Sequence, residues 1–347
     1  MTQSSNQTGY PLRNNFDILR TALAYMVVIS HARFLFGANA TYFPFNLSGL
    51  GVDGFFVISG FLMAWSLERQ PELKPYTVKR FFRIYPLYFV IVSLQAILFA
   101  ALAIPGFPQI ATETLQYYSC NLVFLNFLKP SIDGVLAGLS VNAINGSLWT
   151  LKVETAFYVV LPMLLFLYRA LGRMALFCGY AFSSAYVILL PSAPWTEQLP
   201  GQLRFFIIGI LLFFYGRRLS WNSTGLLALG LVGVIINFLM RAAGVPGAGL
   251  STTILDPIFT GCLVYGIAFA RFVWQADTDF SYSAYLLHFP LIQLALLYQV
   301  FSQSFWLFLA FILVSTTALA WLSFRFVEQP FIAVGRTLAS RYAGGNR

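Results

Sequence analysis

Two histidines and one arginine are the residues whose positions most directly suggest chemistry. The chain has two histidines, His31 and His288, and both lie in long apolar segments. An imidazole titrates near neutral pH, so both rings are candidate functional groups, and His31 is a candidate general base. Arg20 precedes His31 by eleven residues, and on a helix both side chains would share one face, about 16 Å apart along the axis. In the alternative interpretation, Arg20 anchors the segment at a surface and His31 is a buried polar contact.

Two carboxylates stand near the start of other apolar segments. Asp53 lies in a Gly-Val-Asp-Gly stretch, and Glu154 follows shortly after Trp149. If both segments run opposite to the first one, the two carboxylates fall at the depth of His31. A carboxylate beside a histidine orients the ring and stabilises the imidazolium. We therefore predict a layer of His31, Asp53 and Glu154, which also requires that these helices touch.

A basic stretch precedes the third apolar segment. Residues 68–83 (ERQPELKPYTVKRFFR) read as a loop that ends on Arg80 and Arg83, with Arg69 and Lys79 in the same stretch. Two arginines at i and i+3 face the same way, and arginine makes bidentate contacts to phosphate. The stretch predicts a site for a phosphate-bearing donor, with membrane anchoring as the alternative.

Other polar side chains are weaker candidates. Substrate contacts are expected of Ser59, Ser147, Trp149, Lys152 and Arg33, and packing is the alternative role of the first three. A donor for a developing oxyanion is also needed, and the candidates are Arg33, Lys152 and Arg204. The three cysteines (Cys120, Cys178 and Cys262) form no C-x-x-C pair, so neither a disulfide framework nor a metal site is expected.

The composition shows what kind of protein must position these residues. Of 347 residues, 59% are hydrophobic and 10% are charged, and the mean hydropathy is +0.74. Ordinary soluble domains are about 25% charged. These values exclude a soluble enzyme, a disordered protein and, despite the net charge of +9, a nucleic-acid-binding domain. The sequence predicts an all-α polytopic integral membrane protein.

Ten apolar runs have roughly the 20 residues that cross a bilayer. Their approximate limits are 17–36, 50–67, 83–104, 149–168, 173–190, 201–216, 224–240, 252–272, 281–300 and 304–326. We divide the chain into a flexible cytoplasmic N-terminus (1–15), a transmembrane domain (16–332) and a short basic cytoplasmic tail (333–347). In the long connection 105–148, Tyr117–Leu128 is too short to cross and predicts an interfacial or re-entrant segment. Residues 1–15 lack the features of a signal peptide.

The positive charges indicate the orientation. With the N-terminus in the cytoplasm, sixteen of the twenty-one lysines and arginines lie on the inner side. The five on the outer side are Arg33, Lys129, Lys152, Arg204 and Arg241. Both termini are therefore expected to be cytoplasmic.

The sequence thus predicts a phosphate-binding site on the inner side and a His–carboxylate layer farther out. Together these two features favour a membrane transferase. The alternative is a transporter or flippase of lipid-linked sugars, which would use the same buried charges as a path. Transporters often contain inverted repeats, and the sequence shows no internal repeat.

Six sequence pieces, in order, resemble acyltransferase family 3, the integral-membrane enzymes that O-acylate bacterial surface carbohydrates. The resemblance covers about residues 16–332. The pieces are Arg20-x10-His31, GVDGFFVISGF at 51–61, RFFRIYP at 80–86, SLWTLKVE at 147–154, YSAYLLHFP at 282–290 and FVEQPF at 326–331.

The resemblance implies a site and its substrates. His31 would be the catalytic histidine, Arg20 its partner, Glu154 a residue lining the site, and Arg80 and Arg83 the ligands of acyl-coenzyme A, most often acetyl-coenzyme A. Acceptors would be sugar hydroxyls of lipopolysaccharide, exopolysaccharide, peptidoglycan or lipid-linked oligosaccharide, reached from the bacterial inner membrane. Proteins of polysaccharide assembly are candidate partners; nucleic acid and metal are not expected.

The sequence also departs from common patterns of the family. Thr155 follows Glu154 where many relatives carry a second acid, and the chain ends soon after the tenth span, so the extracytoplasmic hydrolase-like domain of some relatives is not expected.

Three roles stay open. His31 is expected to act as a base in direct transfer or as a covalent acyl carrier. His288 is expected either to contact the thioester end of the donor or to cap a helix packing site. Arg325 and Glu328, at i and i+3, are expected to form a structural ion pair.

Overall fold

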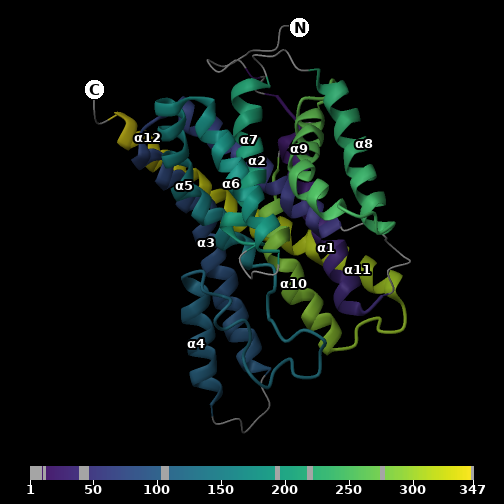
Figure 1. The fold of residues 1–347 in the computed structure, drawn as a ribbon. Coiled ribbons are helices and arrows are strands. Elements are labelled where there is room, and N and C mark those ends of the chain that lie inside the picture. Colours follow the sequence, from purple (N-terminus) through teal and green to yellow (C-terminus); the bar gives the residue numbers. More distant parts are fainter. Residues whose placement is uncertain are drawn as a thin grey trace. The chain divides into compact units, whose positions relative to one another are not determined.

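The computed structural model describes residue 10 and residues 13–38, 47–102, 109–191, 196–216, 222–273 and 278–344. In these residues the structure contains helices and no strand (Figure 1). The helices, in chain order, are α1 (Phe16–Phe36), α2 (Leu47–Arg69), α3 (Leu73–Ala101), α4 (Ile110–Leu122), α5 (Trp149–Leu171), α6 (Arg173–Leu189), α7 (Leu199–Tyr215), α8 (Ser223–Ala242), α9 (Ala248–Ala268), α10 (Ser281–Leu297), α11 (Phe305–Ser323), the π-helix η2 (Phe324–Glu328) and α12 (Gln329–Gly344).

The helices confirm a multi-pass membrane protein. Seven helical stretches in the described residues are long and apolar enough to cross a bilayer: α1, α2, α3, α5, α8, α9 and the continuous stretch Phe305–Tyr342. Three further apolar helices, α6, α7 and α10, have 17 residues each. These ten stretches follow the order of the predicted spans. The number of ten crossings and the cytoplasmic termini stay predictions, and most of residues 1–15 lies outside the described residues.

One predicted boundary changes. Residues 73–83, which we expected to be part of a loop, are the first three turns of α3. Pro75 falls in the first turn of that helix, where a missing N–H leaves no helical hydrogen bond unmade, and the lysines and arginines that follow are good helix formers. Residues 333–344 of the predicted tail are helical and belong to α12, and the tail at 333–347 stays a prediction.

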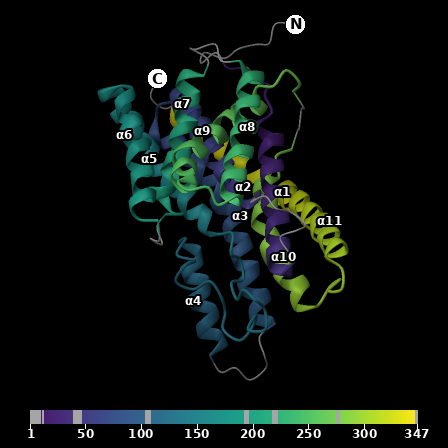
Figure 2. The ribbon, with the colours of Figure 1, turned by 45° about the vertical axis from the view of Figure 1, so that its right-hand side comes forward.

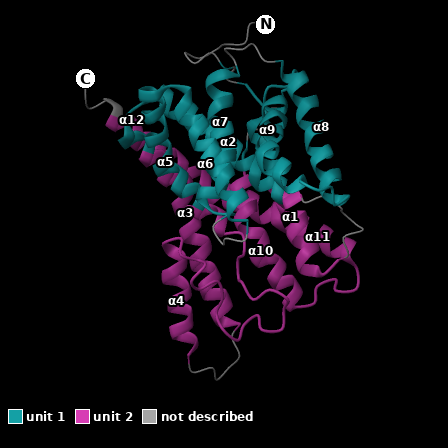
Figure 3. Cartoon of the chain, in the orientation of Figure 1, with its two compact units in different colours: residues 1–23, 49–76, 153–279 teal, residues 24–48, 77–152, 280–347 magenta. Residues whose placement is uncertain are grey.

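The chain forms two compact units, coloured separately in Figure 3. Unit 1 comprises residues 1–23, 49–76 and 153–279, and unit 2 comprises residues 24–48, 77–152 and 280–347. Helices α1, α2, α3 and α5 each contribute residues to both units.

Unit 1 brings two helices together at glycines. A Cβ added to Gly60 of α2 would overlap the carbonyl oxygen of Phe206 in α7, and one added to Gly209 would overlap the carbonyl oxygen of Val57. Small residues allow membrane helices to approach this closely. Gly60 and Gly209 therefore form a contact surface between two unbroken helices.

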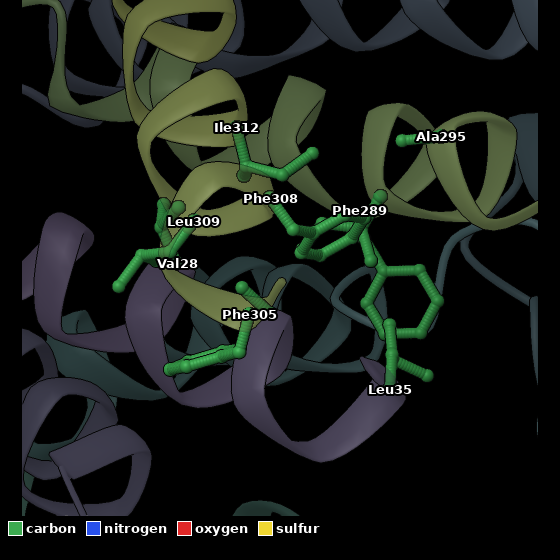
Figure 4. Close-up of a cluster of buried hydrophobic side chains, with 10 residues drawn as sticks. Val28, Leu35, Phe289, Ala295, Phe305, Phe308, Leu309 and Ile312 are labelled. Carbon is green, nitrogen blue, oxygen red and sulfur yellow. The ribbon is translucent and has the colours of Figure 1, made fainter. Parts of the chain in front are cut away.

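Unit 2 has an apolar core made by α1, α10 and α11 (Figure 4). Val28 of α1, Phe289 of α10 and Phe308 and Ile312 of α11 lie buried against one another. Helices α10 and α11 lie side by side in Figure 2 as well as in their contacts. This core holds the part of α1 that carries His31 against the part of α10 that carries His288.

The long connection between α3 and α5 is a packed part of unit 2. Helix α4 begins at Ile110, seven residues before the segment we predicted, and lies along α3 (Figures 1 and 2). The hydroxyl of Tyr117 donates to Oε1 of Gln95 at 3.0 Å, and that of Tyr88 donates to the carbonyl oxygen of Asn121 at 2.5 Å. At the surface of this connection, a hydrogen bond from Lys129 lowers the pKa of Glu113.

The glycine contact makes a prediction about stability. Gly60→Ala should destabilise the protein by about 1–3 kcal/mol, because the new methyl group meets backbone that cannot rotate away. The measurement is the melting temperature of the purified protein in detergent. Gly249→Ala on α9 is the matched control, since open space surrounds that position. An unchanged melting temperature for Gly60→Ala would contradict the close approach.

Candidate functional site

The two histidines of the chain meet in unit 2. Nδ1 of His31 lies 2.8 Å from Nε2 of His288, within hydrogen-bonding distance. The ring planes differ by 8° and the ring centroids are 5.1 Å apart. His288 is fully buried, whereas His31 is partly exposed. We predicted separate roles for these two residues, and in the structure they lie in contact although 257 positions of sequence separate them.

The surroundings of the pair are aromatic and backbone groups. Nδ1 of His288 lies 3.2 Å from the carbonyl oxygen of Ala284, one turn earlier in α10. The ring of Phe289 meets His31 edge-on at a centroid distance of 5.3 Å, and Tyr285 packs against His288 at 5.7 Å. The imidazoles are therefore held on several sides.

A short segment before α5 holds α10 in place. Nδ2 of Asn145 donates to the carbonyl oxygen of Leu286 at 2.9 Å, and Oγ of Ser147 donates to Oδ1 of Asn145 at 2.6 Å. Oγ1 of Thr150 forms a 2.9 Å hydrogen bond with the hydroxyl of Tyr285. Ser147, a predicted substrate contact, is fully buried and uses its hydroxyl inside the protein, while Trp149 is partly exposed.

Arg20 has a carboxylate partner that sequence reasoning missed. In unit 1 its Nη1 lies 2.5 Å from Oδ2 of Asp279, two residues before α10 begins. Asp279 stands in a polar stretch between two apolar segments, and nothing in that stretch indicates a contact with a residue 259 positions earlier.

The expected ion pair between Arg325 and Glu328 is wrong. Oε1 of Glu328 accepts from Nη1 of Arg83 at 2.8 Å, and its Oε2 accepts from Oγ of Ser283 at 2.7 Å. Arg325 donates instead to Gln329 at 3.0 Å. The physical reason is the π-helical turn η2, whose wider i→i+5 bonding shifts the side chains that follow out of the α-helical i, i+3 relation.

The predicted phosphate ligands lie on two helices. Lys79, Arg80 and Arg83 fall within two turns of α3 in unit 2 and are partly exposed, and Arg69 is exposed at the end of α2 in unit 1. Arg83 uses Nη1 toward Glu328, but a guanidinium has five N–H donors. Their role as phosphate ligands stays a prediction.

The predicted carboxylates lie in unit 1. Asp53 is within electrostatic range of Arg204, and Oε1 of Glu154 accepts from the hydroxyl of Tyr158 at 3.0 Å. Asp256 is also within electrostatic range of Asp53; it accepts from Asn237 at 2.5 Å and was not found from the sequence. The layer of these carboxylates with His31 stays a prediction.

The other candidate side chains are partly exposed. Lys152 lies over the ring of Phe127, 4.4 Å from its centroid, which is a cation–π distance. Arg33 is near the end of α1, and Ser59 is in α2. In the described part of the chain, no three His, Cys, Asp or Glu side chains gather as a metal-ligand set.

Comparison with known proteins gives the family. A family model described as an acyltransferase domain matches residues 13–325. The chain belongs to acyltransferase family 3. Nodulation protein 10 of Rhizobium leguminosarum bv. viciae is 28% identical over 97% of this chain and 98% of its own length.

Further relatives carry more specific names. The O-acetyl transferase of Shigella phage Sf6 is 25% identical over 92% of this chain and 96% of its own length. The exopolysaccharide production protein ExoZ of Rhizobium meliloti is 33% identical over 38% of this chain and 39% of its own length. No solved structure matches the chain significantly.

The acyltransferase family 3 sequence pieces contact one another in unit 2. Arg83 of the third piece meets Glu328 of the last, and Ser283 of the fifth binds the same carboxylate. The fourth piece holds Tyr285 through Thr150. The two histidines come from the first and fifth pieces. Helix α10, which carries the fifth piece, therefore contacts the first, third, fourth and last pieces.

Removing the charge of Glu328 from its ion pair with Arg83 should destabilise the protein. Glu328→Gln should cost about 3–5 kcal/mol, because it leaves the mostly buried guanidinium of Arg83 without its counter-charge. The measurement is again the melting temperature in detergent. Arg325→Gln, on an exposed side chain of the same π-turn, should leave it unchanged.

A double variant separates charge from packing. Arg83→Met combined with Glu328→Leu removes both charges together, so it should melt well above Glu328→Gln alone. If Glu328→Gln melted like the unmodified protein, the ion pair would have no structural importance.

Proposed function

We propose that this protein transfers an acyl group, acetyl in the first instance, from acyl-coenzyme A to a carbohydrate hydroxyl of the cell surface or of a lipid-linked precursor. The observation that carries the proposal is the hydrogen-bonded pair of His31 and His288 in a member of acyltransferase family 3. The name of one relative, O-acetyl transferase, supports the acetyl group, and that of ExoZ supports a carbohydrate acceptor.

The proposed topology has ten crossings of the bacterial inner membrane and both termini in the cytoplasm. It is supported by the seven long and three shorter apolar helices and by the excess of lysine and arginine on one side. In this orientation Lys79, Arg80 and Arg83 face the cytoplasm, where acyl-coenzyme A is available. Their positive charges and guanidinium geometry suit its phosphates.

The proposed chemistry is base-catalysed acyl transfer. His31 takes the proton from a sugar hydroxyl, and that oxygen bonds to the thioester carbonyl carbon. The tetrahedral intermediate then breaks its C–S bond, and the departing sulfur takes the proton from His31. A cation such as Lys152, Arg33 or Arg204 would stabilise the oxyanion. The rival route is an acyl group carried covalently by His31.

Removal of the base tests the proposal directly. His31→Ala should lower acyl transfer by about 10²–10⁴-fold, the usual contribution of a general base, while the protein still inserts into the membrane. The measurement is transfer of labelled acetyl from acetyl-coenzyme A to a surface-carbohydrate extract by purified protein in lipid. Arg325→Gln serves as the control. Near-normal transfer by His31→Ala would remove the base assignment, and no transfer by the unmodified protein would favour the transporter alternative.

The donor site makes a separate kinetic prediction. Arg80→Gln should raise the KM for acetyl-coenzyme A about 10–100-fold with little change in kcat, because one charge-assisted hydrogen bond is worth about 1.5–3 kcal/mol. Steady-state kinetics with varied donor concentration measure it. A fall in kcat with constant KM would contradict a phosphate-binding role.

A further inference from the structure

We propose that His288 is a positioning residue that fixes the tautomer of His31, with the hydrogen on Nδ1 and the lone pair on Nε2. The catalytic consequence rests on the proposed function: Nε2 of His31 would be the atom that takes the proton from the acceptor hydroxyl. The tautomer itself follows from two hydrogen bonds and from the burial of His288.

The chain of hydrogen bonds runs in one direction. The carbonyl oxygen of Ala284 can only accept, so Nδ1 of His288, 3.2 Å away, carries a hydrogen. In a neutral imidazole the other nitrogen then has a lone pair. Nε2 of His288 is therefore an acceptor, and Nδ1 of His31 at 2.8 Å is its donor.

The opposite tautomer of His31 would require His288 to be a buried cation. If His31 accepted this hydrogen bond, both nitrogens of His288 would carry hydrogens and the ring would be a cation. His288 is fully buried, and its contacts among the described residues are His31, aromatic rings and backbone, with no carboxylate. A buried cation without a counter-charge is strongly disfavoured, so the neutral pair is the resting state.

The position of His288 is fixed by its neighbours. Tyr285, which packs on its ring, is hydrogen-bonded to Thr150, and Phe289 on the other side belongs to the apolar core of unit 2. His31 is the partly exposed member of the pair. The pair therefore places an oriented donor–acceptor contact at Nδ1 of His31 and leaves Nε2 outside that contact.

The tautomer is restored in each turnover. When Nε2 of His31 takes the hydroxyl proton, the ring becomes an imidazolium whose Nδ1–H bond to His288 gains the strength of a charged donor. The same Nε2–H then gives its proton to the departing sulfur. Both imidazoles return to their starting state, so no rearrangement of hydrogens is needed. His288 thereby orients the base as the carboxylate does in a Ser-His-Asp triad, but the orienting group here is a neutral imidazole.

The protein has two histidines in all, so ¹⁵N-histidine labelling gives a spectrum of these two rings alone. Solid-state NMR of the full chain in lipid vesicles should show Nδ1 protonated and Nε2 unprotonated on both rings. It should also show a correlation from the Nδ1 hydrogen of His31 to Nε2 of His288. A protonated Nε2 on His31 in the resting protein would overturn the proposal.

Variants of His288 connect the tautomer to activity. In His288→Gln, the side-chain amide oxygen can still accept from Nδ1 of His31, so the tautomer should remain and kcat should fall modestly. In His288→Leu the acceptor is gone, the Nε2–H tautomer should appear in the spectrum of the single remaining ring, and kcat should fall about 10²–10⁴-fold. The KM for acetyl-coenzyme A should stay within about twofold in both.

A matched variant separates orientation from general damage to α10. Gln293 is also fully buried in α10 and donates to the carbonyl oxygens of Val141 and Ala143. Gln293→Leu should lower stability without changing the tautomer of His31. Full kcat in His288→Leu would overturn the positioning role. If the unmodified protein transferred no acyl group, the proposed function would fail while the resting spectrum still decided the tautomer.

Discussion

Polar side chains on α10 must find partners inside the protein, and that requirement organises unit 2. Ser281, Ser283, His288 and Gln293 are all fully buried, and an unmatched polar group in such surroundings costs several kcal/mol. Ser283 meets Glu328, His288 meets His31, and Gln293 meets the backbone of the α4–α5 connection. Because these partners come from separate parts of the chain, they fix both the rotation of α10 about its axis and its position along that axis. The position of the His288 ring relative to His31 is fixed by the same contacts.

The residues in the sequence pieces shared with acyltransferase family 3 therefore have two different roles. Some place groups that are still accessible, such as the partly exposed ring of His31 and the basic first turns of α3. Others hold the scaffold: Ser147 and Thr150 are buried and bind α10, and Glu328 binds Arg83 and Ser283. A motif residue is thus not automatically a substrate contact. In this chain the contacts among motif residues explain why they occur together.

Properties that repeat along the chain could be predicted from the sequence, and contacts between distant residues could not. Hydropathy gave the membrane class and the order of the apolar helices, because every residue of a span contributes to the signal. The shared face of Arg20 and His31 also follows from helix geometry. The meeting of His31 with His288, and of Arg20 with Asp279, joins residues more than 250 positions apart and leaves no local pattern. The ion pair between Arg325 and Glu328, predicted from their i, i+3 spacing, was wrong because the π-turn changes the helical register and has no obvious sequence signal.

Two helical stretches with most or all of their residues in unit 2 are longer than a membrane is thick. Helix α3 has 29 residues and the stretch Phe305–Tyr342 has 38, about 44 Å and 57 Å of helix against a hydrocarbon core of about 30 Å. Beyond Arg83 and Glu328 they stay in contact, since Phe82 packs against Gly335. Two long helices in contact with each other form a stiff pair. If the basic first turns of α3 bind the donor as proposed, that surface is ordered before the donor arrives, so binding should carry a small conformational-entropy penalty.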